Sequence, residues 1–290
     1  MPQFDINKTY KCEICVESKF ARKPFKSIER SSELLELVHT DICDLKMTLT
    51  RGGKKYFITF IDDYSRFCYV YLLHRKNETI DVFKTYKNEV ENKKNKTLKM
   101  LRFDRGGEYE STTLFEFCAL HGIMHQTTTP YTPQQNGIAE RNNRTLKNMV
   151  NSMLNSSGLP YYMWGKAFLI ANTILNRIPH KKTSKSPYEL WKGKLASYKK
   201  LKVWGCLAKV QVPLPKRKKL GLKTIDCVFI VYASNSLAYR FLVIKSEVPG
   251  INNNIIMESI DAEFFEEIFP FKERHNEIIK IKIDDSLPRT

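Results

Sequence analysis

Three strand-like runs followed by alternating helical and strand-like segments restrict the fold of this chain more than any other feature. Runs rich in Val, Ile, Phe and Tyr cover residues 35–45, 54–62 and 66–73, and turn compositions separate them. This pattern predicts a three-stranded antiparallel meander. The folded part of the chain is therefore expected to begin with a sheet.

Helical periodicity then alternates with short strands. A helix is predicted over residues 78–92, with Asn77 as its cap. The pattern continues with a strand at 97–103, a helix at 112–121 and a strand at 123–127. A helix that leads into a new strand implies a crossover, so this order is typical of a mixed α/β domain with carboxylates at its strand ends.

A polar loop that runs into a helix occupies residues 130–150 and carries one acid near the start of the helix. Thr132 can cap this helix, and Gln135 can complete a capping box. Gly137 would interrupt the first turns of a helix that began there. A firm helix is therefore expected from about Gly137.

The spacing of residues assigns two faces to this helix. Glu140, Arg144 and Lys147 share a polar face, on which one acid precedes two bases. One interpretation is a solvated ion pair between Glu140 and Arg144, and the other is a functional acid. The buried stripe is expected to contain Ile138, Leu146, Met149, Val150 and Met153.

The second half of the chain changes from helical to strand-like composition. A long helix over residues 160–177 carries aromatic and aliphatic side chains that are interpreted as core. Short β-like runs follow at 203–212, 225–233 and 238–245, separated by basic or small polar turns, and they predict a small β-barrel. No element is predicted after Lys272.

The chain is strongly basic. Lys and Arg number 48 against 31 Asp and Glu, which gives a formal charge of +17 and favours a polyanion partner, most simply nucleic acid. The alternative is a soluble basic surface without a function. No apolar stretch is long enough to span a membrane, and residues 1–5 lack the features of a signal peptide. We therefore expect an intracellular protein without a membrane partner.

The seven cysteines are odd in number and mostly scattered, which indicates reduced thiols. Cys12 and Cys15 have the spacing of half a tetrahedral zinc site, whose metal needs two further ligands. Cys43, Cys68 and His39 all lie in predicted buried strands. A complete zinc site is therefore not expected within this polypeptide.

Three acids stand out from the others by their context. Asp41 lies inside an otherwise apolar strand, where an unpaired carboxylate is costly. Asp104 ends a second predicted strand and precedes two glycines, and Glu140 lies behind the polar loop. If the two strands pair and the helix packs across their ends, the three carboxylates converge. Such a cluster would suit Mg²⁺ or Mn²⁺ better than Zn²⁺.

Several motifs give the chain a specific resemblance that covers residues 10 to about 270. They are HTDIC at 39–43, FITFIDDYSR at 57–66, DRGGEY at 104–109, PYTPQQNGIAER at 130–141 and VWGC at 203–206. The chain resembles the integrases of copia-type long-terminal-repeat retrotransposons, in the ribonuclease H-like superfamily with an acid triad. The 35 residues between Asp104 and Glu140 match that family's spacing.

The resemblance implies a fold, an activity and a set of ligands. The fold would be a ribonuclease H-like mixed sheet with flanking helices, followed by a small SH3-like β-barrel. Asp41, Asp104 and Glu140 would bind two Mg²⁺ or Mn²⁺ ions for phosphoryl transfer. Water would first trim the ends of the element's double-stranded DNA, and the new 3′ ends would then attack target DNA. A homo-oligomer, and a nuclear location after a cytoplasmic particle stage, are also implied.

Other polar residues receive separate interpretations. Arg141, Arg144 and Lys147 are candidates for contacts to DNA phosphates, and Gln135 and Asn136 for contacts to bases at the cleavage point. Asp62, Asp63 and Glu108 are interpreted as caps or ion pairs at turns, outside the chemistry. Two interpretations stay open for one basic run, namely a nuclear import signal and a barrel loop that touches DNA; the run contains Lys216, Arg217, Lys218 and Lys219.

We expect four segments along the chain. Residues 1–28 would be a truncated zinc-module remnant and basic linker, 29–185 the catalytic core, 186–271 the SH3-like domain and 272–290 a tail. The family's zinc module uses two histidines before the cysteine pair, and this chain starts after that point.

Two other interpretations of the function remain open. The runner-up is a catalytically inactive DNA-binding and oligomerising remnant of a Pol polyprotein, and a lesser alternative is a ribonuclease H-type enzyme that cuts RNA–DNA hybrids. The family pattern usually has glycine where this chain has Val231, which is expected to distort a tight turn.

Overall fold

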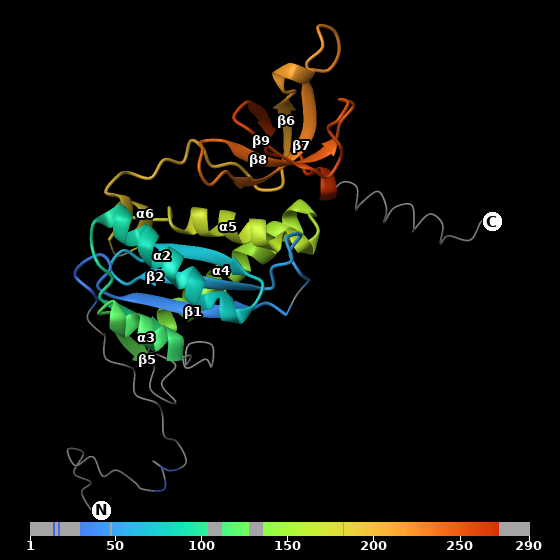
Figure 1. The fold of residues 1–290 in the computed structure, drawn as a ribbon. Helices are drawn as coiled ribbons and strands as arrows, with labels where there is room; N and C mark the ends of the chain where they lie inside the picture. The colour runs from blue at the N-terminus through green and yellow to red at the C-terminus, as the bar shows by residue number, and fades with distance from the viewer. Residues whose placement is uncertain are drawn as a thin grey trace, which may run out of the picture. The chain divides into compact units, whose positions relative to one another are not determined.

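The structure is a computed structural model that describes residues 14, 17, 30–46, 48–103, 112–127, 136–181 and 183–272. The chain divides into two units, Met1–Arg30 and Ser31–Thr290. The second unit contains two sheets and the helices that cover them (Figure 1).

The first sheet is mixed and has the strand order β3-β2-β1-β4-β5. Strands β1, β2 and β3 pair antiparallel as the predicted meander, whereas β4 and β5 continue the sheet in parallel from β1. This combination is the mixed α/β architecture expected from the sequence. The strands are β1 (Val38–Asp44), β2 (Tyr56–Asp62), β3 (Cys68–Leu73), β4 (Met100–Phe103) and β5 (Met124–Thr127).

Alternating side chains of this sheet enter two separate hydrophobic clusters. In β2, Phe57 and Ile61 pack in one cluster with residues of α4 and α5, while Ile58 and Phe60 pack in the other with residues of α2 and α3. Helices therefore cover both faces of the sheet. Their bounds are α2 (Thr79–Lys94), α3 (Thr112–Leu120), α4 (Gly137–Ser157) and α5 (Trp164–Leu175).

Helix α2 starts differently from the prediction. Asn77 lies inside a 3-10 turn, Lys76–Glu78, and Glu78 takes the N-cap position without a side-chain capping bond. The predicted Asn77 cap is therefore wrong, because the 3-10 turn leads directly into the helix. The buried face contains Phe83, Tyr86 and Val90, and the ring of Tyr86 stacks on that of Phe60 at 4.3 Å.

The second sheet is antiparallel, with the strand order β10-β6-β7-β8-β9. Three of its strands correspond to the predicted runs, and the short strands β9 and β10 had no sequence prediction. The bounds are β6 (Leu207–Gln211), β7 (Thr224–Tyr232), β8 (Tyr239–Lys245), β9 (Ile256–Ser259) and β10 (Ala262–Phe265). A 3-10 turn, Leu214–Lys216, follows β6.

Val231 does not lie in a tight turn. It is a residue of β7 beside a register shift between Phe229 and Val231, and it is 5% exposed. The positive-φ residues of the described chain do not include Val231. A valine is therefore accommodated at this bulge without left-handed backbone strain.

The short helix α6 (Pro187–Lys192) begins with a capping box formed by Ser186 and Glu189. Its Trp191 stacks on Phe67 at 5.3 Å and belongs to the cluster on the α2 side of the first sheet. Trp191 thus packs on the core, although the predicted SH3-like segment starts at residue 186. The boundaries at 28, 185 and 271 stay predictions.

The described cysteines are not joined by disulfide bonds. Cys43, Cys68, Cys118, Cys206 and Cys227 are all free thiols. None of the helices in the described part of the chain has both the length and the apolarity needed to cross a bilayer.

Gly205 brings the start of the second sheet against the end of α4. Its φ is +82°, and a Cβ atom there would lie 2.4 Å from Cβ of Ser157. The VWGC motif therefore contains a glycine that is required both by its backbone conformation and by this contact.

We expect Gly205→Ala to lower the free energy of unfolding, because alanine adds about 1–2 kcal/mol of left-handed strain and about 1–3 kcal/mol of overpacking. Urea unfolding followed by circular dichroism measures the loss. Gly52→Ala is the matched control, since nothing lies within 4 Å of a Cβ atom at that position. Equal midpoints for the two variants would contradict the assigned contact.

Candidate active site

Asp41 lies in the middle of β1, at the centre of the first sheet, and is half-buried. The parallel partner of β1 is β4, and Phe103 at the end of β4 pairs with Thr40, the residue before Asp41. Asp104 follows Phe103 in the sequence but lies outside the described residues. The strand that leads to the second predicted acid therefore ends beside the first one.

Glu140 lies in the first turn of α4 and is half-buried. Three residues later on this helix, Asn143 donates a hydrogen bond from Nδ2 to Oδ2 of Asp41, at 2.9 Å. Residues three apart share a helix face. The end of α4 that carries Glu140 is thus held against the strand that carries Asp41.

The alternative interpretation of Glu140 as half of an ion pair is wrong for this structure. Within the described residues, the Glu140 carboxylate forms no salt bridge with Arg144, whose side chain is exposed. Helix α2, on the opposite face of the sheet, does form such pairs, including Lys87 with Glu91 at 2.7 Å. Glu140 therefore has no structural partner of the kind that explains most helical acids.

The Asn143 amide is bonded on both sides. Its Oδ1 accepts a hydrogen bond from Oγ1 of Thr59 at 3.0 Å, and Thr59 pairs with Asp41 across β1 and β2. Asn143 is 1% exposed and Thr59 is fully buried. Because buried amides are costly when unpaired, these two bonds fix the orientation of the amide and of the Asp41 carboxylate.

Asn143 was absent from the sequence prediction of this site. The buried stripe of α4 contains Ala139, Asn143, Leu146, Val150 and Leu154, whereas the predicted Ile138, Met149 and Met153 are only partly buried. The available signal was a polar residue at helical spacing within an apolar stripe. Such a residue has to find a polar partner in the core.

Cys43 completes the surroundings of Asp41 on the same face of β1. Its Sγ lies 3.7 Å from Oδ2 of Asp41 and 3.5 Å from Nδ2 of Asn143. Burial, followed by the charge of Asp41, raises the pKa of the Cys43 thiol to about 12. The thiol is therefore protonated at neutral pH and donates a hydrogen bond to the Asp41 carboxylate.

Asp62 has a structural role, as the sequence predicted. Its carboxylate accepts bonds from the backbone N–H of Leu35 and from both the N–H and the hydroxyl of Ser65. These bonds hold Leu35, a fully buried residue with a φ of 64°. Burial raises the pKa of Asp62 against these hydrogen bonds.

Asp63 is also occupied within the fold. It accepts hydrogen bonds from Nε2 of His39 at 2.9 Å and from the N–H of Ser31 at 2.8 Å, and it forms an ion pair with Nη1 of Arg66 at 3.1 Å. Burial alone would raise the pKa of Asp63, but these hydrogen bonds and the charge of Arg66 lower it well below its usual range. Burial lowers the pKa of His39, which therefore donates as a neutral imidazole. Glu108, the third excluded acid, lies outside the described residues.

The predicted DNA-contact residues of α4 divide into exposed and buried positions. Arg141, Arg144 and Lys147 are exposed, and Nε of Arg141 donates to the carbonyl of Gly137 at 2.8 Å. Asn136 is 1% exposed at the N-cap of α4 and forms no side-chain hydrogen bond with any described residue. Gln135 lies outside the described residues.

The basic run lies in the connection between β6 and β7. Lys218 and Lys219 are exposed, while Arg217 is half-buried. Nζ of Lys216 donates to the carbonyl of Gly250 at 2.9 Å. The run is therefore attached through Lys216 to the loop that follows β8, and it presents Lys218 and Lys219 to solvent.

Three of the predicted metal ligands lie outside the described residues. Cys12 and Cys15 lie outside them, as does Asp104. Within the described ranges, no three His, Cys, Asp or Glu side chains are grouped to hold a metal ion. Asp41 and Glu140 are the two members of the predicted triad that can be located.

Comparison with known proteins identifies the family. The chain matches the Integrase core domain over residues 32–133 and the Retroviral polymerase SH3-like domain over residues 206–277. It is 43% identical over 251 residues to the Retrovirus-related Pol polyprotein from transposon TNT 1-94 of Nicotiana tabacum, which covers 86% of this chain. The chain belongs to the copia-type retrotransposon integrases.

Other similarities agree with the integrase assignment. The Pol polyprotein from transposon RE2 of Arabidopsis thaliana is 31% identical over 91% of this chain. The integrase spans 19% of the TNT 1-94 polyprotein and 18% of the RE2 polyprotein.

A solved structure with the same fold is that of a simian T-cell lymphotropic virus intasome in complex with a PP2A regulatory subunit. Its TM-score is 0.53 at 16% identity, with 86% of this chain and 88% of that chain covered. The predicted fold, a ribonuclease H-like core followed by an SH3-like domain, is confirmed.

The Thr59–Asn143 bond should be measurable as a coupling energy. We expect Thr59→Val to destabilise the integrase by about 1–3 kcal/mol, because it leaves Oδ1 of Asn143 buried without a donor. Asn143→Leu should destabilise the Thr59→Val variant less than it destabilises the wild type. The difference between these two losses, the coupling energy, should be about 0.5–3 kcal/mol. Urea unfolding of the four proteins measures this, with Thr59→Ser as the control that keeps the donor. Additive losses would show that the two residues are not coupled.

The lowered pKa of Asp63 predicts a pH-dependent contribution to stability. Asp63→Asn should cost about 3 kcal/mol at pH 7, because it removes the buried charge that accepts hydrogen bonds from His39 and Ser31 and pairs with the half-buried Arg66. The difference from wild type should shrink as the pH falls below about 4, the unfolded pKa, since Asp63 is then protonated in the unfolded state. Thermal unfolding from pH 7 to 3 measures this. Asp81→Asn, at an exposed acid, should change little at any pH.

Proposed function

We propose that this integrase carries out 3′-end processing and strand transfer, joining the ends of double-stranded element DNA to target DNA. Asp41, Asp104 and Glu140 are proposed as its catalytic acids. The observation that carries the proposal is the Asn143–Asp41 hydrogen bond, which places the helix of Glu140 on the central strand of the core. The family assignment supports the same chemistry.

The side chains of the proposed site suit a hard divalent cation. Asp41, Asp104 and Glu140 supply carboxylate oxygens, the ligand type preferred by Mg²⁺ and Mn²⁺. The surroundings of Asp41 provide two hydrogen-bond donors to its Oδ2, Nδ2 of Asn143 and the Cys43 thiol. Two such ions, when bound, supply activation of the attacking oxygen and stabilisation of the leaving oxygen.

The chain's own residues orient the acids and bind the substrate. Asn143 holds Oδ2 of Asp41 in place, so this carboxylate does not need to be ordered when DNA arrives. Cys43 contributes a protonated thiol to the same oxygen. Arg141, Arg144 and Lys147 present positive charge on the exposed side of α4, next to Glu140, and bind DNA phosphates.

The remaining expectations about partners belong to this proposal. The net charge of +17 supports binding to element ends and target DNA with a strong dependence on salt. Gln135 is proposed to reach bases, whereas Asn136 is buried and is not proposed as a base contact. Lys216, Arg217, Lys218 and Lys219 are proposed to contact DNA or direct nuclear import. A homo-oligomer and a nuclear site of action are proposed, with residues 29–185 and 186–271 as the two domains. Cys12 and Cys15 supply half of a zinc ligand set, so no zinc site is proposed for this polypeptide.

Glu140→Gln should abolish the chemistry while leaving DNA binding intact. With Mg²⁺ and labelled terminal-repeat duplexes, both processed and joined products should fall by at least about 100-fold, because a group required in the transition state is lost. Glu116→Gln makes the same charge change at an exposed residue of α3 and should leave product formation unchanged. Fluorescence anisotropy measures DNA binding separately.

The outcomes of this assay separate the three candidate functions. Products from wild type and Glu116→Gln, but not from Glu140→Gln, support an active integrase with this acid in the site. Folded proteins that all bind DNA and form no product would favour the inactive DNA-binding remnant. Cleavage of RNA–DNA hybrids in place of duplex DNA would favour the ribonuclease H-type alternative.

A further inference from the structure

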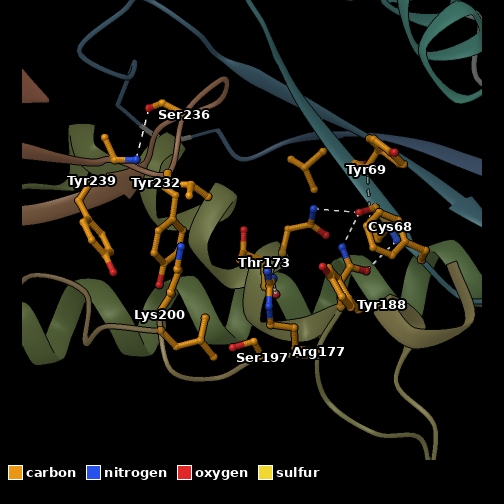
Figure 2. A pocket seen from close by; sticks show the side chains of 17 residues that line it. Cys68, Tyr69, Thr173, Arg177, Tyr188, Ser197, Lys200, Tyr232, Ser236 and Tyr239 are labelled. Atoms are coloured by element: carbon orange, nitrogen blue, oxygen red, sulfur yellow. Dashed lines mark hydrogen bonds between the residues drawn. The ribbon is translucent and has the colours of Figure 1, made fainter. Parts of the chain in front are cut away.

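A cavity of about 380 Å³ lies where β3 and α5 meet β7 and β8, and its described lining includes neither Asp41 nor Glu140. Figure 2 shows Tyr232 and Tyr239 on one side of it and Cys68, Tyr69 and Tyr188 on the opposite side, with Thr173 and Arg177 of the helical segment between them. The loop that contains Ser197 and Lys200 contributes the remaining edge. The volume lies within the range of small-ligand pockets, about 300–1,000 Å³.

The walls of this cavity are rich in aromatic rings. Tyr232 and Tyr239 lie 5.8 Å apart between ring centroids, and Phe67 and Tyr69 lie 5.2 Å apart. Tyr188 adds a fifth ring, which faces the Arg177 guanidinium at 4.8 Å. Rings of this kind form stacking surfaces for planar groups, and nucleobases are recognised in this way regardless of their identity.

The polar groups of the cavity favour an anionic ligand. Its lining includes Arg177 and Lys200 and contains no Asp or Glu among the described residues. Nη1 of Arg177 donates to the carbonyl of Thr173 at 2.7 Å, yet its Nε is buried without a partner in the described part of the chain. A guanidinium with an unused donor is well suited to a phosphate oxygen.

Asn172 leaves an unused acceptor in the same lining. Its Nδ2 donates to the carbonyl of Cys68 at 2.9 Å, which fixes the side chain, while its Oδ1 is buried and has no donor among the described residues. Buried polar atoms without partners are uncommon in folded proteins because each one costs free energy. Every nucleobase carries at least one N–H group that could satisfy this acceptor.

We propose that this cavity binds one nucleotide, with the base between the aromatic walls and the phosphate at Arg177 and Lys200. The choice of a nucleotide over other aromatic anions rests on the proposed DNA-joining function and on the net charge of +17. The nucleotide is either a free mononucleotide or an unpaired nucleotide at the end of a DNA strand. Both sources present the same base and phosphate to the cavity.

Fluorescence of 2-aminopurine tests the proposal with the full chain in EDTA, where no DNA joining takes place. The probes are 2-aminopurine deoxynucleoside monophosphate and a duplex with one unpaired 5′ 2-aminopurine nucleotide. Stacking on the tyrosines should quench at least one probe in a saturable way. Arg177→Gln should raise the Kd of that probe about 10-fold, because a charge-assisted bond to phosphate is lost.

Two further variants protect the test against misfolding. Ser197→Trp places an indole at the edge of the cavity from an exposed loop residue and should reduce quenching by more than about 5-fold by filling the space that the base requires. Lys200→Gln should raise the Kd by about 3-fold through the loss of one exposed phosphate contact. Lys199→Gln is the matched control, because Lys199 is exposed and does not line the cavity, and it should leave the Kd unchanged.

The outcomes distinguish the source of the nucleotide and separate this proposal from the proposed function. Quenching of the monophosphate points to free nucleotides, whereas quenching of the unpaired duplex end alone points to DNA. The proposal is overturned if neither probe is quenched, or if Arg177→Gln and Ser197→Trp leave the quenching unchanged. It is also overturned if an aromatic peptide displaces the probe and dAMP does not. Cavity binding that persists in a protein without joining activity would reject the proposed function alone.

Discussion

The amide of Asn143 connects the two halves of the catalytic core. It is bonded to Asp41 of β1 and to Thr59 of β2, so α4 is docked on the centre of the sheet by polar contacts as well as by Leu146 and Val150. Apolar packing alone is non-directional and tolerates small rotations of a helix. The two hydrogen bonds select one rotation of α4 about its own axis. This rotation also sets the direction in which the Glu140 side chain projects from the helix.

The strands and helices of the core were predictable because their signals are local. The largely apolar run of β2 reflects burial on both faces of the sheet, and the helical spacing of α2 reflects burial on one face. Strands β9 and β10 are four residues each, and their exposed side chains give no apolar run. They form by pairing with β8 and β6, so their existence depends on distant segments.

The sequence predicted three acids for this site, and it did not predict the contacts that hold Asp41. Asp62 and Asp63 could be set aside from sequence because acids at a strand-to-turn junction find nearby N–H donors, such as Ser65. Asn143 could not be assigned, because its partners Thr59 and Asp41 are 84 and 102 residues away. A buried amide has no sequence pattern of its own, and its role depends on what the fold brings to it.

The contact at Gly205 has a mechanical consequence for the whole molecule. Helix α4 has 21 residues, which corresponds to a rod about 30 Å long. Glu140 lies in its first turn, and Ser157, its last residue, touches Gly205 at the start of the second sheet. A load applied to the second sheet is therefore transmitted along one stiff element to Glu140. The second sheet cannot be displaced at this contact without also moving helix α4.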